Sequence, residues 1–278
     1  MSNGSIELSG QTIHWQTWGD ERNKPVLALH GWLDNSESFI RLAPQLDGMF
    51  IVAIDMAGHG YSDHRPWPGS YNIWDDLIDI LALADHFGWD KFSLLGHSRG
   101  AIIAALFAAS QPERVEKLIL LDGIIPGPAK VEDTAKQLGR YLTQHSLRAE
   151  KASPSYQQFD DAMNARCKAA NMTALTAKPI LDRGLVQGND RLWRWRSDPR
   201  LTMDSAVKFS IEQIDAYVKA ISCPALLLLA NEGIAKHETF VAMLAGWSNI
   251  EKIQFDGSHH FHLEPVATEI AEKINAWF

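Results

Sequence analysis

Cysteine is almost absent from this chain, which has two cysteines, Cys167 and Cys223, among 278 residues. They stand far apart, and no metal-ligand spacing surrounds either of them. We therefore interpret both as reduced thiols and expect no disulfide framework. Reduced thiols are typical of a cytoplasmic protein, which is the location we expect.

Long apolar runs and targeting signals are also missing. The longest runs, such as 101–109 and 118–121, are far too short to span a bilayer, and the first ten residues do not resemble a signal peptide. The formal net charge of −8 argues against a surface that binds nucleic acid. Neither G-x-G-x-x-G nor G-x-x-x-x-G-K-[ST] occurs, so we expect no nucleotide or flavin cofactor.

What the chain does contain is a regular alternation of short apolar runs and segments of helical period. Six runs, most of them without polar alternation, are typical of strands covered on both faces, and they lie at 26–30, 51–55, 92–96, 118–122, 225–230 and 250–255. A strand pair at 6–9 and 12–18 precedes them. Helical patterns between or after these runs lie at 38–46, 73–87, 99–110, 236–245 and 265–278. This order predicts an α/β protein with an eight-stranded, mostly parallel sheet flanked by helices.

One long segment interrupts the alternation. Residues 126–204 contain helical patterns but no candidate strand, and Pro126-Gly127-Pro128 marks their start. The sheet pattern resumes at 225, which favours an insertion over a separate domain. We therefore predict a core of 1–125 and 205–278 with a helical cap, or lid, at 126–204.

The strongest chemical signal is the sequence Gly96-His97-Ser98-Arg99-Gly100, a G-x-S-x-G between an apolar strand and a helix. In that context the serine sits on a sharp turn with its hydroxyl exposed, and the glycines leave room for neighbouring backbone. The blander interpretation is a serine that only caps the helix. For an oxyanion hole we expect the backbone amides of Arg99 and of Trp32, since Trp32 lies in the loop just after the strand predicted at 26–30.

A serine nucleophile needs a base, and the expected chain order puts this histidine after the last strand. His259 comes first there and is our choice, with His260 and His262 as competitors. A histidine cluster also admits a zinc site, but no Cys, Asp or Glu stands near it at metal-ligand spacing, so we predict no metal.

Two strand ends could supply the acid that orients the histidine. Asp122 ends the sixth strand of the expected sheet and is followed by Gly123, whereas Glu232 lies just after the seventh strand. Either position can reach the same point, so the residues alone leave both open, with Asp122 favoured.

Four segments together resemble the α/β-hydrolase superfamily. They are 30–35 (HGWLDN), Asp55 with 58–62 (GHGYS), 96–100 (GHSRG) and 257–259 (GSH). Within that superfamily the chain is most similar to the serine hydrolase-like proteins. The resemblance implies Ser98 as nucleophile, His259 as base and Asp122 as acid, and it makes Asp55 to Gly60 a structural turn. Two departures are Ala101, where many members have glycine, and a spacing from His259 to Pro265 that is one residue shorter than usual.

The function that follows is hydrolysis of a small-molecule ester through an acyl-enzyme on Ser98. A slow-turnover ligand receptor, a C–C bond hydrolase and a cofactor-free oxygenase remain alternatives on the same fold. Arginines 191, 194, 196 and 200 interleave with Trp193 and Trp195 in the cap. We interpret them as surface arginines stacked on cap tryptophans or paired with Asp190 and Asp198, and a carboxylate-binding patch is the alternative. The sequence predicts no oligomeric state.

Overall fold

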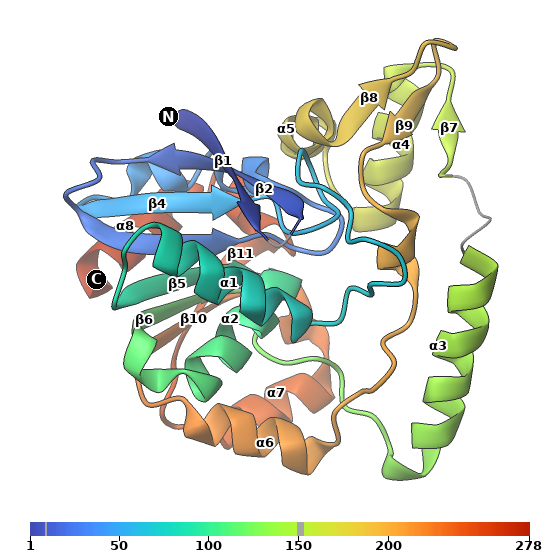
Figure 1. Ribbon diagram of the computed structural model, residues 1–278. Helices are drawn as coiled ribbons and strands as arrows, with labels where there is room; N and C mark the ends of the chain where they lie inside the picture. Colours follow the sequence, from blue (N-terminus) through green and yellow to red (C-terminus); the bar gives the residue numbers. More distant parts are fainter. Residues whose placement is uncertain (9, 149–152) are drawn as a thin grey trace.

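The computed structural model describes residues 1–8, 10–148 and 153–278, and its centre is one eight-stranded sheet (Figure 1). The strand order is β1-β2-β4-β3-β5-β6-β10-β11. β2 runs antiparallel to β1 and β4, and the remaining neighbours are parallel. This confirms the predicted fold class. The strands are β1 Ser2–Leu8, β2 Gln11–Trp18, β3 Lys24–Leu29, β4 Met49–Ile54, β5 Phe92–His97, β6 Val115–Leu121, β10 Ala225–Glu232 and β11 Glu251–Ser258.

Helices cover both faces of this sheet, so the central strands are apolar on both sides. In β3, Leu27 and Leu29 belong to one buried cluster while Val26 and Ala28 belong to the other, as a side-chain period of two requires. The first cluster also takes side chains from α1 Asp75–His86, α2 Arg99–Ser110, α6 Ile211–Ala220 and α7 Glu238–Ala245. The second takes them from the 3₁₀ helices η1 Ser36–Phe39 and η2 Ala43–Gln45 and from α8 Ala267–Trp277.

The segment between β6 and α6 forms a layer of its own, seen on the right of Figure 1. It holds η4 Val131–Asp133, α3 Thr134–Arg148, β7 Ser155–Tyr156, α4 Phe159–Ala170, α5 Ala174–Gly184, β8 Leu185–Gln187, β9 Trp193–Trp195 and η5 Pro199–Thr202. The prediction that this segment has no strands was wrong, because β7, β9 and β8 form a small antiparallel sheet. Each of these strands has only two or three residues, too few to show a period.

One predicted helix was wrong, and one helix was missed. The helix expected at 38–46 is replaced by η1 and η2, and Pro44 near the start of η2 interrupts the hydrogen-bond pattern of a longer helix. α6 was not predicted, although Ser210 and Gln213 form its capping box and Ile214 and Val218 bury one face. Shorter 3₁₀ turns are η3 Pro112–Arg114, η6 Ile234–Lys236 and η7 Phe261–Leu263. Within the described ranges no helix is long and apolar enough to cross a membrane.

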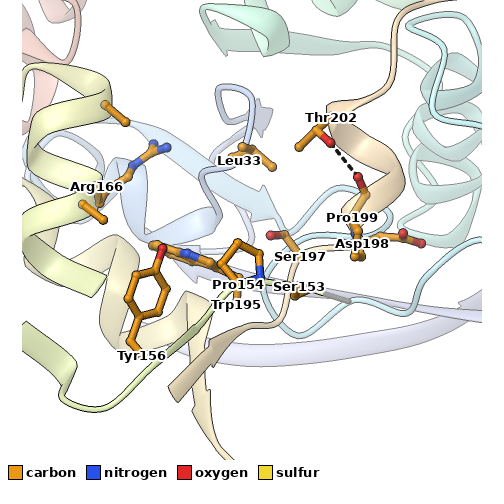
Figure 2. Close-up of a pocket in the computed structure, with 12 residues that line it drawn as sticks. Leu33, Ser153, Pro154, Tyr156, Arg166, Trp195, Ser197, Asp198, Pro199 and Thr202 are labelled. Atoms are coloured by element: carbon orange, nitrogen blue, oxygen red, sulfur yellow. Dashed lines mark hydrogen bonds between the residues drawn. The ribbon is translucent and has the colours of Figure 1, made fainter. Parts of the chain in front are cut away.

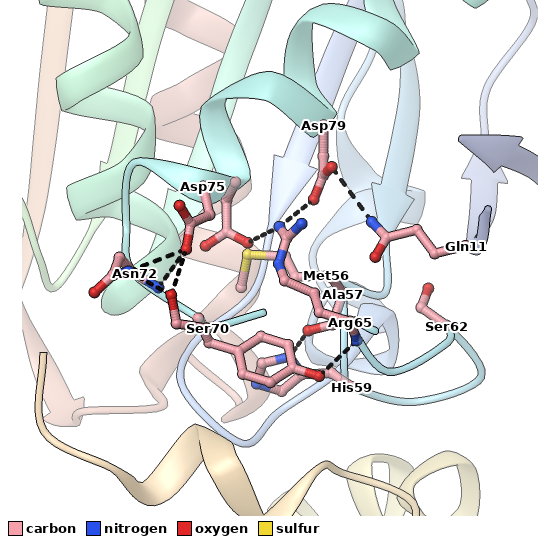
Figure 3. Close-up of polar contacts among 12 residues, drawn as sticks. Gln11, Met56, Ala57, His59, Ser62, Arg65, Ser70, Asn72, Asp75 and Asp79 are labelled. Atoms are coloured by element: carbon pink, nitrogen blue, oxygen red, sulfur yellow. Dashed lines mark hydrogen bonds and ion pairs between the residues drawn. The ribbon is translucent and has the colours of Figure 1, made fainter. Parts of the chain in front are cut away.

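Hydrogen bonds and ion pairs connect α1 to the rest of the core (Figure 3). The Arg65 guanidinium lies 2.6 Å from Asp79 Oδ2 and 3.3 Å from Asp76 Oδ1. Asp76 also pairs at 2.8 Å with Arg99, the first residue of α2. Burial raises the pKa of Asp79 to about 6, against the opposing effect of Arg65.

This pKa makes part of the folding stability depend on pH. Because the folded-state pKa of Asp79 lies above its ordinary value of 3.8, the protonated carboxyl is stabilised by folding. That contribution is complete below about pH 4 and is lost as the pH rises through 6. Relative to Asp79→Asn, the wild-type free energy of unfolding should therefore fall by up to about 3 kcal/mol between pH 4 and 7. Urea unfolding at a series of pH values measures the difference.

Asp85→Asn is the matched control, because Asp85 lies on the same helix but its side chain is 67% exposed. This variant should track the wild type over the same pH range. If the difference between wild type and Asp79→Asn does not change with pH, Asp79 does not titrate in this window.

Candidate active site

Ser98 occupies the tight turn between β5 and α2. Its backbone has φ 52° and ψ −114°, a conformation that non-glycine residues rarely adopt, and its amide donates to the Leu121 carbonyl at 3.0 Å. Glycines surround the turn because there is no room for side chains. A Cβ on Gly100 would lie 2.0 Å from the Leu29 carbonyl oxygen, and one on Gly123 would lie 2.6 Å from that of Ser98.

The structure brings Ser98, His259 and Asp122 into one hydrogen-bonded chain, although 161 residues separate the first two. His259 Nε2 lies 2.8 Å from Ser98 Oγ, and His259 Nδ1 lies 2.5 Å from Asp122 Oδ2. Since an ionised carboxylate only accepts hydrogen bonds, Nδ1 carries the proton and Nε2 is free to accept from the serine hydroxyl.

Asp122 is fully buried and is held by backbone amides on both of its oxygens. Ala230 N donates to Oδ1 at 3.0 Å and Ile234 N to Oδ2 at 3.1 Å. A Cβ on Gly233 would lie 2.0 Å from Oδ2, so glycine allows this approach. The alternative acid, Glu232, is not part of this arrangement: its side chain is 58% exposed and pairs with Lys236.

Trp32 lies in the loop between β3 and η1, and Arg99 is the first residue of α2. Among the described residues no hydrogen bond occupies either backbone amide. Two buried histidines stabilise the loop that contains Trp32.

His30 accepts a hydrogen bond from Met56 N at 3.0 Å through Nε2, and His59 accepts one from Leu33 N at 3.3 Å. Burial lowers the pKa of His30 and holds that of His59 well below its ordinary value, so both are neutral.

An apolar pocket of about 370 Å³ opens beside Ser98. Its lining includes Ile102 and Ile125 on the side of the sheet and Phe240 and Met243 from α7. The ionisable residues in the described part of the lining are Asp122 and His237. A pocket of this size and composition fits a small uncharged group better than a charged one.

A second cavity, of about 430 Å³, lies between Leu33 in the loop after β3 and the cap (Figure 2). In Figure 2, Arg166 projects from α4 on one side, and Thr202 and Asp198 lie on the other. Leu33 contributes from the loop, but Ser98 does not line this cavity. This cavity is larger than the pocket beside Ser98, but Ser98 lines only the smaller one. The smaller pocket is therefore the candidate site for the group that reacts with the serine hydroxyl.

His260 and His262, the alternative candidates for the catalytic base, are buried, and it is His259 that hydrogen-bonds to Ser98. His260 and His262 are 4% and 0% exposed, and both rings pack against His97. His260 and His97 lie beside the buried carboxylate of Asp34. Burial would raise the pKa of Asp34, but His260 and Arg166 outweigh it and hold that pKa well below its usual range. Sequence reasoning assigned no role to Asp34 or His97, because spacing along the chain does not show that they meet.

Other polar motifs serve the structure. The buried carboxylate of Asp55 accepts from Ser36 N and Tyr61 N, at 2.9 and 2.8 Å, and pairs with Arg183 of the cap. In the cap, the predicted pairing of arginines with aspartates is confirmed for two of them: Arg194 pairs with Asp190 and Arg200 pairs with Asp198. Arg196 lies over the ring of Tyr61 in the core and not over a cap tryptophan.

Comparison with known proteins shows the family to which the chain belongs. A family model described as the alpha/beta hydrolase fold matches residues 24–265. A probable serine hydrolase of Drosophila melanogaster is 31% identical, over 93% of this chain and 82% of its own. A serine hydrolase-like protein of Danio rerio is also 31% identical, over 90% of this chain and 80% of its own.

Solved structures give the same result. A hypothetical protein from Pseudomonas aeruginosa PAO1 superposes with a TM-score of 0.96 at 37% identity, covering 100% of this chain and 99% of its own. The thioesterase domain of a curacin biosynthetic pathway, at 23% identity and a TM-score of 0.84, shares the fold over 99% of this chain and 98% of its own. The chain therefore belongs to the α/β-hydrolase family, among relatives described as serine hydrolases.

Proposed function

We propose that this protein hydrolyses carboxylic esters of small molecules through an acyl-enzyme on Ser98. The observation that supports this proposal is the continuous chain of contacts from Ser98 Oγ through His259 to Asp122. A free serine hydroxyl is almost un-ionised at neutral pH, and an adjacent imidazole is the usual means of activating it.

In the first half-reaction, Ser98 Oγ attacks the ester carbonyl carbon while its proton moves to His259 Nε2. The imidazolium that forms is stabilised by the Asp122 carboxylate 2.5 Å from Nδ1. When the tetrahedral intermediate collapses, the bond from carbon to the leaving oxygen breaks. His259 gives its proton to that oxygen, and the alcohol departs.

In the second half-reaction, water takes the place of the alcohol. His259 accepts a proton from the water, whose oxygen attacks the acyl carbon, and collapse returns the proton to Ser98 Oγ and releases the acid. In both halves the carbonyl oxygen becomes negative. The amides of Trp32 and Arg99 would stabilise it, since they are unoccupied within the described ranges. The second of these also lies at the positive end of the α2 dipole.

The first test is covalent labelling. A fluorophosphonate probe should label the wild-type protein at one site, and Ser98→Ala should abolish both labelling and hydrolysis of nitrophenyl acetate, because the Ser98 hydroxyl is the one that is hydrogen-bonded to His259 within the described ranges. Ser110→Ala is the control, since Ser110 is exposed at the far end of the same helix and should leave both unchanged. Intact-protein mass spectrometry gives the stoichiometry.

Labelling that persists in Ser98→Ala would remove this serine from the mechanism. Labelling of Ser98 without turnover of any ester would instead indicate a slow ligand receptor. If Ser98 were labelled but the protein cleaved carbon–carbon bonds and no esters, it would be a C–C bond hydrolase and not an esterase.

The second test separates the two candidate acids. Asp122→Asn keeps the volume but loses the charge that fixes the Nδ1–H tautomer, so kcat should fall by about 10³ to 10⁴ at pH 7. Glu232→Gln should change kcat less than twofold, because Glu232 contacts Lys236 at the surface. Steady-state kinetics on both variants, with circular dichroism as a folding control, gives the ranking. The reverse ranking would move the acid to Glu232.

The third test addresses the apolar pocket beside Ser98. Enlarging Met243 by Met243→Trp should shorten the preferred chain in a panel of nitrophenyl esters from acetate to decanoate, with kcat/KM for the longest esters falling at least tenfold relative to acetate. Val241→Trp is the control on the same helix, since Val241 is 47% exposed. A chain-length profile unaltered by Met243→Trp would place the acyl group elsewhere.

A further inference from the structure

Three side chains that no step of the hydrolysis uses meet behind the Ser98 turn. Asp34 Oδ2 lies 3.2 Å from His260 Nε2 and 3.6 Å from His97 Nδ1, and all three atoms lie within 4.8 Å of one another. The three residues come from three different segments: the loop after β3, the end of β5 and the loop after β11. All three are buried.

The hydrogen bonding of His97 determines which of its nitrogens faces this group. His97 Nε2 lies 2.9 Å from the carbonyl oxygen of His259, and a carbonyl can only accept, so Nε2 carries the proton. His97 is fully buried. Its Nδ1 therefore presents a lone pair toward the Asp34 carboxylate, with no hydrogen between the two atoms. Two electron-rich atoms that face each other in a buried space repel unless a cation lies between them.

Unsatisfied nitrogens gather around the same point. Among the described residues, His97 Nδ1, His260 Nδ1 and both ring nitrogens of His262 are buried without a hydrogen-bond partner. Each such group costs free energy, and buried polar atoms are rarely left unpaired. Of these four atoms, His97 Nδ1 faces the Asp34 carboxylate, and an ion bound there by Asp34, His97 and His260 would satisfy it.

We propose that Asp34, His97 and His260 form a binding site for a divalent transition-metal ion of the zinc type. Bonds of 2.0–2.1 Å in a tetrahedral arrangement put ligand atoms roughly 3.3–3.4 Å apart. The separations of 3.2 and 3.6 Å around Asp34 Oδ2 bracket this value. Two imidazoles and one carboxylate suit zinc, copper or nickel, whereas calcium and magnesium prefer oxygen ligands in larger number.

Gly31 leaves the space that the ion needs. A Cβ at this position would lie 2.8 Å from Asp34 Oδ2 and 2.8 Å from His97 Nδ1, and would therefore fill the point where the two ligand atoms converge. Any other amino acid at position 31 would close the site.

The surrounding contacts are those that metal ligands require. A histidine that binds a metal usually donates its other N–H to a carbonyl or carboxylate, as His97 does to the His259 carbonyl. A carboxylate ligand is usually hydrogen-bonded on its second oxygen, and Asp34 Oδ1 contacts the Arg166 guanidinium from α4 of the cap. A bound ion would thus connect the serine turn, the histidine loop and the cap.

The test is metal binding, which does not depend on the proposed hydrolysis. After chelator treatment, Co²⁺ should bind the full-length protein with 1:1 stoichiometry and give visible absorption bands of a four- or five-coordinate site, and Zn²⁺ should displace it. Zn²⁺ should also raise the melting temperature, because an ion that binds only the folded state stabilises it. Ser98→Ala should bind as tightly as the wild type, so loss of activity and loss of metal binding are distinguishable.

His260→Gln should weaken Co²⁺ binding at least tenfold and remove the visible bands. His86→Gln, which changes an exposed histidine of α1, should not affect either measurement. If His260→Gln does not fold, as judged by circular dichroism, Gly31→Ala is the second variant. It keeps all three ligands and should weaken binding by filling the space between them. A wild-type protein that shows no Co²⁺ bands and no shift in melting temperature with Zn²⁺ would overturn the proposal, as would a folded variant that binds like the wild type.

Discussion

Ser98 lies in a turn where backbone segments from several strands come into close contact, and the geometry of the rest of the site depends on this close packing. Ser98 keeps a φ of 52° because the chain reverses there between a buried strand and a buried helix. Glycine at 100 and at 123 lets the carbonyls of Leu29 and Ser98 come within distances that a Cβ would forbid. Unfavourable backbone geometry of this kind persists only where the surrounding packing determines it, and here β5 and the N-terminal part of α2 are almost entirely buried.

Neutral histidines are the second structural theme of the site. His30 and His59 each use one ring nitrogen to accept from a backbone amide and the other to contact a carbonyl, at 2.7 and 3.1 Å. Such a ring fixes two backbone segments at once, which a charged imidazolium, having no acceptor, could not do. His259 differs because a buried carboxylate stands at its Nδ1 and its side chain is 33% exposed. The same side chain therefore has a structural role at His30 and His59 and a different environment at His259. The hydrogen-bond partner of each ring nitrogen and the burial of the ring make the difference.

Much of the core could be predicted because its signals are local. The six runs of the parallel strands, the glycines around Ser98 and the position of His259 after the last strand are all readable as short patterns. The cap strands could not be predicted, since a strand of two or three residues has no measurable period. The helix at 38–46 was predicted from apolar spacing, but Pro44 removes a backbone donor that a continuous helix needs. The meeting of Asp34 with His260, 226 residues apart in sequence, is a product of tertiary structure alone.

The cap is connected to the core at the residues that shape the site, and this has a consequence for substrate entry. The indole of Trp32, the residue whose backbone amide we propose for the oxyanion hole, donates to the Leu201 carbonyl of the cap at 2.8 Å. Arg183 of the cap pairs with Asp55, and the same carboxylate accepts from Ser36 at the start of η1. Moving the cap away as a rigid body would break both contacts and leave the Asp55 charge buried without its partner, which is costly. Substrates are therefore expected to enter beside the cap, along the apolar pocket at α7, rather than by displacement of the whole insertion.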